Sequence, residues 1–135
     1  MVEKGFAVLI LILLSSGCLI HSTGDTLHVV SVGEQNAVYH FGDRVVINVS
    51  IYSPDAIKNI TVKLSGLKNK LGQSKIHKSK NVDLEEGNNI ISFKCWIPTC
   101  SPCNKLYPGS YYINATVMQN GEVIAEGSSI VRLEE

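Results

Sequence analysis

The chain has 135 residues, of which 44% are hydrophobic and 18% charged, and its 12 lysine and arginine residues balance its 12 aspartate and glutamate residues. This length suits one domain, and the hydrophobic content is sufficient for a packed core, so the composition excludes a disordered acidic chain. A net charge of zero also excludes a nucleic-acid binder of the polybasic-tail type.

The N-terminal segment has the layout of an export signal. Lys4 is followed by a mostly apolar stretch without charges over residues 5–20. That stretch is shorter than the ~20 apolar residues that a membrane-spanning helix needs. We therefore expect a signal peptide, with the rest of the chain outside the cytoplasm.

The end of this segment, Leu13-Leu-Ser-Ser-Gly-Cys18, resembles the lipobox of bacterial and archaeal lipoproteins. In that family small residues precede a cysteine that becomes the lipid-modified N-terminus, although Ser15 stands where the family usually has Leu, Val or Ile. The resemblance implies a signal peptide at 1–17, lipid on Cys18 and a location at the outer face of the cell membrane. An ordinary signal peptide or an uncleaved anchor is the alternative. Residues 18–25 then form a tether to a domain at 26–135.

From residue 26 onward, apolar side chains recur at every second position, which is typical of strands with one buried face. The clearest alternation covers residues 45–52, and further runs cover 60–64, 88–97 and 111–118. A break is expected at Ser65-Gly66, and the polar stretch 67–83 predicts a weak strand or two at a sheet edge. Asn120-Gly121 offers the two residues of positive φ that a type I′ hairpin needs before a return strand begins at Val123.

These patterns predict an all-β fold without a sustained helical stripe. Seven or eight short strands in about 110 residues fit a single antiparallel, immunoglobulin-like β-sandwich that follows the hydrophobic N-terminal segment.

The sequence Leu106-Tyr-Pro-Gly-Ser-Tyr111 resembles the E–F corner of immunoglobulin-like and fibronectin type III-like domains, and the resemblance runs over residues 43–133. It implies that Leu106, Pro108 and Gly109 form a turn that delivers a tyrosine, whose hydroxyl then binds a nearby backbone group. Tyr111 is favoured because it shares its phase with the apolar residues of its strand, and Tyr112 is the alternative.

Asn48-Val-Ser, Asn59-Ile-Thr and Asn114-Ala-Thr match the N-glycosylation acceptor pattern. All three asparagines fall on the polar phase of their predicted strands. Glycans at these positions would cover the sheet faces and leave loops and edges for contacts. The alternative is that these asparagine, serine and threonine residues carry no glycan and are ordinary polar residues on the solvent-facing side of the strands. Sequons combined with a lipobox suit an archaeal surface protein.

The cysteines limit the possible chemistry. If Cys18 carries lipid, then Cys95, Cys100 and Cys103 remain, and only one intramolecular disulfide can form. A turn can close Cys100-Ser-Pro-Cys103, and Cys95 has the inward phase of its strand. We predict a Cys100–Cys103 disulfide, with Cys95–Cys103 and Cys95–Cys100 as alternatives.

Two other uses of these thiols have weaker support in the sequence. Cys100-Ser-Pro-Cys103 looks like a thioredoxin-type dithiol, but no activating helix of useful length fits before Pro108. Cys95, Cys100 and Cys103 with His77 supply only half of a zinc signature. We therefore expect no metal and no cofactor, and no hydrolase or phosphate-loop motif is present.

One segment is locally basic despite the zero net charge. No acidic residue occurs between Asp55 and Asp83, and seven lysines do, at positions 58, 63, 68, 70, 75, 78 and 80. Such lysines either dock on an anionic surface of lipid headgroups or acidic glycans, or protect an exposed sheet edge against pairing. Edge protection is the favoured interpretation.

Together these features predict a non-catalytic lipoprotein module for binding or spacing at the outer face of the cell membrane. Its partners would be the membrane, through Cys18 or an uncleaved segment, and an envelope protein or a glycan, whereas nucleic acid is disfavoured by the compartment. One alternative is an extracytoplasmic thiol–disulfide protein that uses Cys100 and Cys103. Another is an inhibitor or subunit of an envelope protein that binds through the 97–107 loop.

Overall fold

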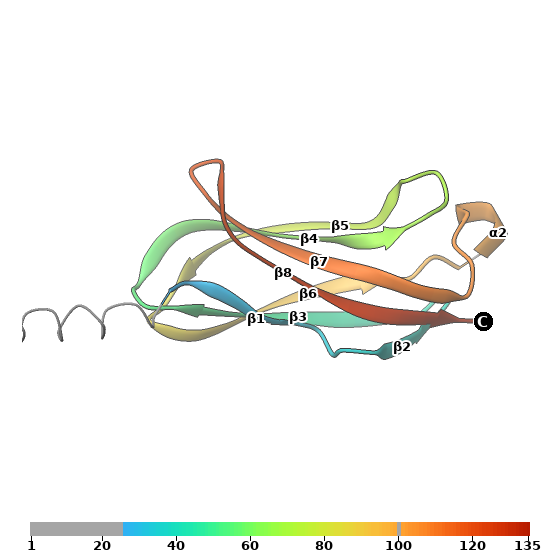
Figure 1. Cartoon of the computed structure of the whole chain (residues 1–135), viewed down its shortest axis with the longest axis horizontal. Helices are drawn as coiled ribbons and strands as arrows, with labels where there is room; N and C mark the ends of the chain where they lie inside the picture. Colours follow the sequence, from blue (N-terminus) through green and yellow to red (C-terminus); the bar gives the residue numbers. More distant parts are fainter. Residues whose placement is uncertain (1–25, 100) are drawn as a thin grey trace, which may run out of the picture.

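The computed structural model describes residues 26–99 and 101–135, so the predicted signal peptide, Cys18, the tether and Cys100 lie outside the described residues. Within these ranges the chain is built of β-strands together with the short helix α2 (Figure 1). Its elements are β1 (His28–Val32), β2 (Ala37–His40), β3 (Arg44–Ser53), β4 (Ile57–Lys68), β5 (Ser74–Leu84), β6 (Gly87–Trp96), α2 (Ser101–Asn104), β7 (Gly109–Gln119) and β8 (Glu122–Glu134). Across the described ranges, no helix has the length and apolar character needed to cross a bilayer.

The strands form two sheets, a small sheet in the order β1-β3-β6 and a large sheet in the order β2-β8-β7-β4-β5. The order corresponds to strands A-B-E and G-F-C-C′ of the immunoglobulin fold, with the first strand divided between the sheets. The two layers confirm the predicted immunoglobulin-like β-sandwich (Figure 1).

One strand pair departs from the antiparallel prediction. β2 runs parallel to β8, whereas every other pair is antiparallel. The prediction of a fully antiparallel sandwich is therefore wrong at this edge. The reason is that β1 and β2 are successive pieces of one edge segment, which keeps its direction while it crosses from the small sheet to the large sheet.

The crossing between β1 and β2 is held by both sheets. Gly33 and Asn36 take left-handed backbone conformations, with φ of 59° and 62°. The Gly33 N–H donates to the Asn48 carbonyl of β3 at 2.7 Å, and the Asn36 N–H donates to the Ile130 carbonyl of β8 at 2.8 Å. The crossing segment thus makes a backbone hydrogen bond first to the small sheet and then to the large sheet.

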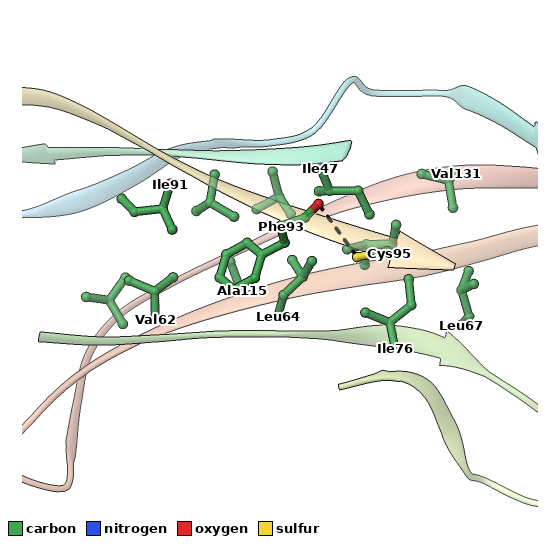
Figure 2. Packing of buried hydrophobic residues seen from close by; sticks show 14 of the residues in the cluster. Ile47, Val62, Leu64, Leu67, Ile76, Ile91, Phe93, Cys95, Ala115 and Val131 are labelled. Atoms are coloured by element: carbon green, nitrogen blue, oxygen red, sulfur yellow. Dashed lines mark hydrogen bonds between the residues drawn. The ribbon is translucent and has the colours of Figure 1, made fainter. Parts of the chain in front are cut away.

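Alternate side chains of both sheets meet in one apolar core, as the period of two predicts. Figure 2 shows Ile47 and Phe93 of the small sheet facing Val62, Leu64 and other residues of the large sheet. Each of these four side chains is buried to at least 99%. Complete burial of such a side chain stabilises the fold by about 1.5–3 kcal/mol before the entropy of ordering is counted.

β4 continues through Ser65-Gly66 to Lys68, so the predicted break at these residues is wrong. Gly66 has φ of 155°, and an added Cβ would lie 2.5 Å from the Tyr112 carbonyl oxygen and 2.8 Å from the Ile113 Cα. The glycine therefore permits a close approach of β4 to β7 and does not end the strand.

Two other local predictions are confirmed. Asn120 and Gly121, with φ of 51° and 80°, connect the antiparallel strands β7 and β8. The polar stretch after β4 forms the edge of the large sheet, although as one long strand, β5.

Gly66→Ala should destabilise the fold by on the order of 3 kcal/mol, because the new methyl group meets backbone atoms of β7 and the residue keeps a strained φ. Gly72→Ala is the matched control, since Gly72 has φ of 79° but no atom within 4 Å of the added Cβ. That control should lose only about 1 kcal/mol. Urea unfolding of the two purified variants measures the difference, and equal losses would contradict the role assigned to Gly66.

Candidate functional site at the loop end

Two connections lie at the end of the sandwich where the chain terminates, opposite the end where the described chain begins (Figure 1). One is the β4–β5 loop, residues 69–73, and the other joins β6 to β7 over residues 97–108 and contains α2. We call the described residues of these two connections the loop end. It includes the described residues of the 97–107 loop, which the sequence suggests as the binding segment of an envelope-protein inhibitor or subunit.

Asn69 joins the two connections into one unit. Its side chain is 7% exposed, and its Nδ2 donates to the Asn104 carbonyl at 3.0 Å and to Gln73 Oε1 at 3.1 Å. Its Oδ1 accepts the backbone N–H groups of Leu71 and Gln73, both at 2.9 Å. The amide thus uses both of its donors and both acceptor positions. A backbone bond from Lys70 N–H to the Lys105 carbonyl, at 3.4 Å, adds a second link.

The outward side chains of the loop end are apolar or cationic. Leu71 is 68% exposed, and the Lys70 ammonium lies 4.6 Å from the centroid of the Tyr107 ring. Lys68, at the end of β4, and Lys105 are exposed as well. The two connections contain no Asp or Glu, and the carboxylate beside them is Glu135, which accepts a bond from Ser101 Oγ at 3.2 Å. The surface therefore combines an apolar anchor with cations.

The E–F corner, residues 106–111, anchors the loop end to the body of the sandwich. Leu106 is fully buried, and the Tyr111 hydroxyl donates to the Tyr107 carbonyl at 2.7 Å and accepts the Tyr107 N–H at 2.9 Å. Tyr112 makes neither bond, and its side chain is 62% exposed. Pro108 and Gly109 connect these residues to β7. The corner fixes the backbone that carries the Tyr107 ring.

The cysteines occupy two different environments. Cys103 is disulfide-bonded, whereas Cys95 is free and buried. The alternatives that pair Cys95 with Cys100 or Cys103 are therefore wrong. Cys95 has the inward phase of β6, and Figure 2 shows its Sγ in the core, 3.9 Å from the Phe93 carbonyl oxygen. Because Cys100 lies outside the described residues, the Cys100–Cys103 pairing stays a prediction.

Neither alternative thiol chemistry gains support from the described part of the chain. Burial raises the pKa of the Cys95 thiol, and Lys78 opposes that shift only in part, so the thiol stays protonated and unreactive at neutral pH. α2 has only four residues, too few for the helix that activates a thioredoxin-type thiol. No three His, Cys, Asp or Glu residues of the described ranges converge as metal ligands, and His77 is exposed on β5.

The three sequon asparagines are exposed on different parts of the sandwich. Asn48 lies on β3 with its Oδ1 accepting the Ser92 hydroxyl at 2.6 Å, and Asn114 lies on β7 in the large sheet. Asn59 lies at the register irregularity between β4 and β5, with its N–H bonded to Asp83 Oδ1 at 3.1 Å. All three asparagines are exposed, and their glycosylation stays a prediction.

The lysines of the basic segment do not form one patch. The Lys80 ammonium binds the Ser92 carbonyl at the free edge of β6 and lies 5.4 Å from the Phe93 ring centroid. It therefore covers a sheet edge, as the edge interpretation expects. Lys70 lies at the loop end instead, Lys68 is the last residue of β4 beside it, and Lys63 lies exposed on β4.

Sequence reasoning missed the role of Asn69. The only local signal is a short polar turn of Asn69 and Gly72 between two strands, which predicts a loop in which asparagine binds nearby backbone. Its bond to Asn104 joins residues far apart in the chain, and no local pattern reports such a contact.

No protein-family model and no curated protein matches this chain. Solved structures share its fold. A β-glucuronidase of glycoside hydrolase family 2 superimposes with a TM-score of 0.58 at 19% identity, over 82% of this chain and 13% of the other. The alkylpurine DNA glycosylase AlkC of Pseudomonas fluorescens gives 0.57 at 22% identity, over 83% and 31%. A Niemann-Pick type C2 protein of the Japanese carpenter ant gives 0.54 at 8% identity, over 82% and 94%.

This chain thus spans less than a third of either enzyme, and identities in this range establish a shared fold alone. The comparisons therefore show that the fold of the described residues recurs in other proteins, and its immunoglobulin-like character rests on the strand order.

Asn69→Ala should loosen the loop end and destabilise the fold by about 2 kcal/mol, because it leaves two partly buried backbone donors and one backbone acceptor without their protein partners. Amide hydrogen exchange should accelerate at Leu71 and Gln73, whose N–H groups bind Asn69 Oδ1. Asn88→Ala, at an exposed asparagine of β6, is the control and should leave both amides protected. Unchanged exchange at Leu71 and Gln73 in the Asn69 variant would argue against a single rigid unit.

Because the pKa of the Cys95 thiol is raised in the folded state, the free energy of unfolding should fall at alkaline pH. Below the ordinary thiol pKa of about 8.5 both states hold the proton, and above it only the unfolded chain ionises freely, so stability should fall as the pH rises. Burial raises the pKa of the Tyr39 hydroxyl too, but that group acts at higher pH. Urea midpoints from pH 7 to 9.5 should therefore show a shallower decline for Cys95→Ala. Identical slopes would refute the assignment.

Proposed function

We propose that this protein is an exported, non-catalytic β-sandwich module that is held at the outer face of the cell membrane and binds an envelope protein or a glycan through its loop end. Lipid on Cys18 is the proposed anchor, and an uncleaved N-terminal segment would hold the domain at the same end. The single observation that carries the proposal is the Asn69 network, which makes two connections into one ordered unit at the end opposite the start of the described chain.

The direction of the strands supports a tethered arrangement. β8 runs over Glu122–Glu134 and, at ~3.3 Å per residue, spans about 40 Å. A domain tethered ahead of β1 would hold its loop end about that far from the anchor. The proposal therefore gives the sandwich the role of a rigid arm and the loop end the role of the contact surface.

The redox state of Cys103 supports export. Disulfides persist outside the cytoplasm and are reduced within it, and Cys103 is disulfide-bonded. Three exposed sequons fit the same compartment.

The composition of the loop end favours binding over spacing. Leu71 and Tyr107 are exposed on backbone that is already ordered by Asn69 and Tyr111. A surface ordered in advance loses less entropy when it binds, so its contacts contribute more to affinity. A spacer needs no exposed apolar anchor at its far end.

Anchoring is tested by the intact mass of protein extracted from membranes of the native host. We expect a chain that begins at Cys18 and carries lipid, and a Cys18→Ser variant that retains residues 1–17. Surface proteolysis of intact cells should degrade the domain. Full-length chain recovered from the cytoplasm, intact after that treatment, would refute the proposal.

Binding is tested by amine-directed cross-linking on intact cells, in which Lys70 and Lys105 should link to a discrete envelope component. Leu71→Ser should abolish these links because it removes the apolar anchor. Val123→Ser is the matched control, because Val123 is 52% exposed next to the β7–β8 turn at the other end of the sandwich. Equal cross-linking by both variants would contradict the loop end as the contact surface.

A further inference from the structure

A second surface lies on the small sheet, where β3 begins and β6 ends. Arg44 pairs with Trp96 in the β3–β6 register, and the guanidinium carbon lies 5.2 Å from the centroid of the indole ring. The Trp96 side chain is nevertheless 58% exposed. Tryptophan and arginine are among the residue types that are enriched at the hot spots of protein interfaces.

The pocket beside Trp96 carries charges of one sign. Its volume is about 260 Å³, and its charged lining residues are Arg44, Lys78 and Lys94. No carboxylate lines it. The adjacent Asp43 is engaged elsewhere, because its Oδ2 accepts the His40 N–H at 2.8 Å and lies 3.7 Å from His40 Nδ1. An occupant of this pocket must therefore supply negative charge.

The backbone of β6 is open along the same corner. β6 is the last strand of the small sheet, so within the described ranges it has a strand neighbour on one side only. The Ser92 carbonyl binds the Lys80 ammonium of β5, which shows that Ser92 directs its backbone away from β3. Backbone groups alternate in direction along a strand, so Lys94 and Trp96 direct theirs to the same open side.

We propose that this cationic corner, formed by Arg44, Lys78, Lys94 and Trp96, binds an extended acidic segment of a partner protein. The open N–H and C=O groups of Lys94 and Trp96 are spaced as the backbone of an added strand requires, and a glycan does not reproduce that spacing. The three cations match acidic side chains of the segment, and Trp96 with Val46 supplies apolar contact. This surface shares no residue with the loop end and does not rest on its function.

Lys80 separates the corner from the first half of the β6 edge. Its ammonium occupies the Ser92 carbonyl and so blocks strand pairing along the middle of the edge. Lys78, two residues earlier on β5, lines the pocket instead. The same strand therefore protects one part of the edge and adds charge to the other.

Trp96 is the sole tryptophan of the chain, so its fluorescence reports on the corner directly. Titration of the full chain with a synthetic peptide of alternating Glu and Val should give a saturable change in emission that weakens with added salt. Lys78→Gln and Lys94→Gln should each reduce the affinity about fivefold. Lys63→Gln, at an exposed lysine of β4 that does not line the pocket, should leave it unchanged.

The result is checked by calorimetry, which detects binding independently of the fluorophore, and Trp96→Phe should weaken the measured affinity. Absence of both heat and emission change at millimolar peptide overturns the proposal. Equal weakening by Lys63→Gln also overturns it, because binding would then follow net charge alone. Binding of polyglucuronate in place of the peptide overturns the peptide assignment.

Discussion

Alternate apolar side chains of the two sheets meet in a single layer, and the position of every other feature depends on that contact. Ile47 and Phe93 from the small sheet interlock with Val62 and Leu64 from the large one (Figure 2). Because side chains alternate across a strand, burial of one set forces the other set into solvent. The same constraint that builds the core therefore exposes Asn48, Asn114 and the Arg44–Trp96 pair on the outer faces.

The edges of the sandwich carry features that limit strand pairing with other chains. One edge segment divides itself between the sheets as β1 and β2, and Gly33 and Asn36 supply the backbone conformations of the crossing. On the other side, Lys80 of β5 covers the backbone of β6 at Ser92. Both devices use local chemistry to limit strand pairing with other chains, and the free backbone that remains is short.

The two candidate surfaces differ in how they are built. The loop end lies on irregular backbone, and its order comes from the bonds of Asn69 and Tyr111. The cationic corner lies on regular strands, so the register of β3 and β6 alone places Arg44 over Trp96. Rigid support is common to both, and it is the property that allows a small exposed set of residues to bind with useful affinity.

Local patterns in the sequence predict which residues face the core, where the β7–β8 hairpin turns and which segment forms the lysine-rich edge, because each of these depends on neighbours within a few positions. The parallel pairing of β2, the close approach at Gly66, the free state of Cys95 and the contact of two loops at Asn69 emerge only when the whole chain is folded. The strand pairing, the close approach and the loop contact each join residues that lie far apart along the chain, and the free Cys95 thiol excludes pairings that the spacing of the cysteines left open. Alternation of apolar side chains shows which face of a strand is buried but not which strand pairs with it or packs against it. That choice depends on the packing of the whole sandwich.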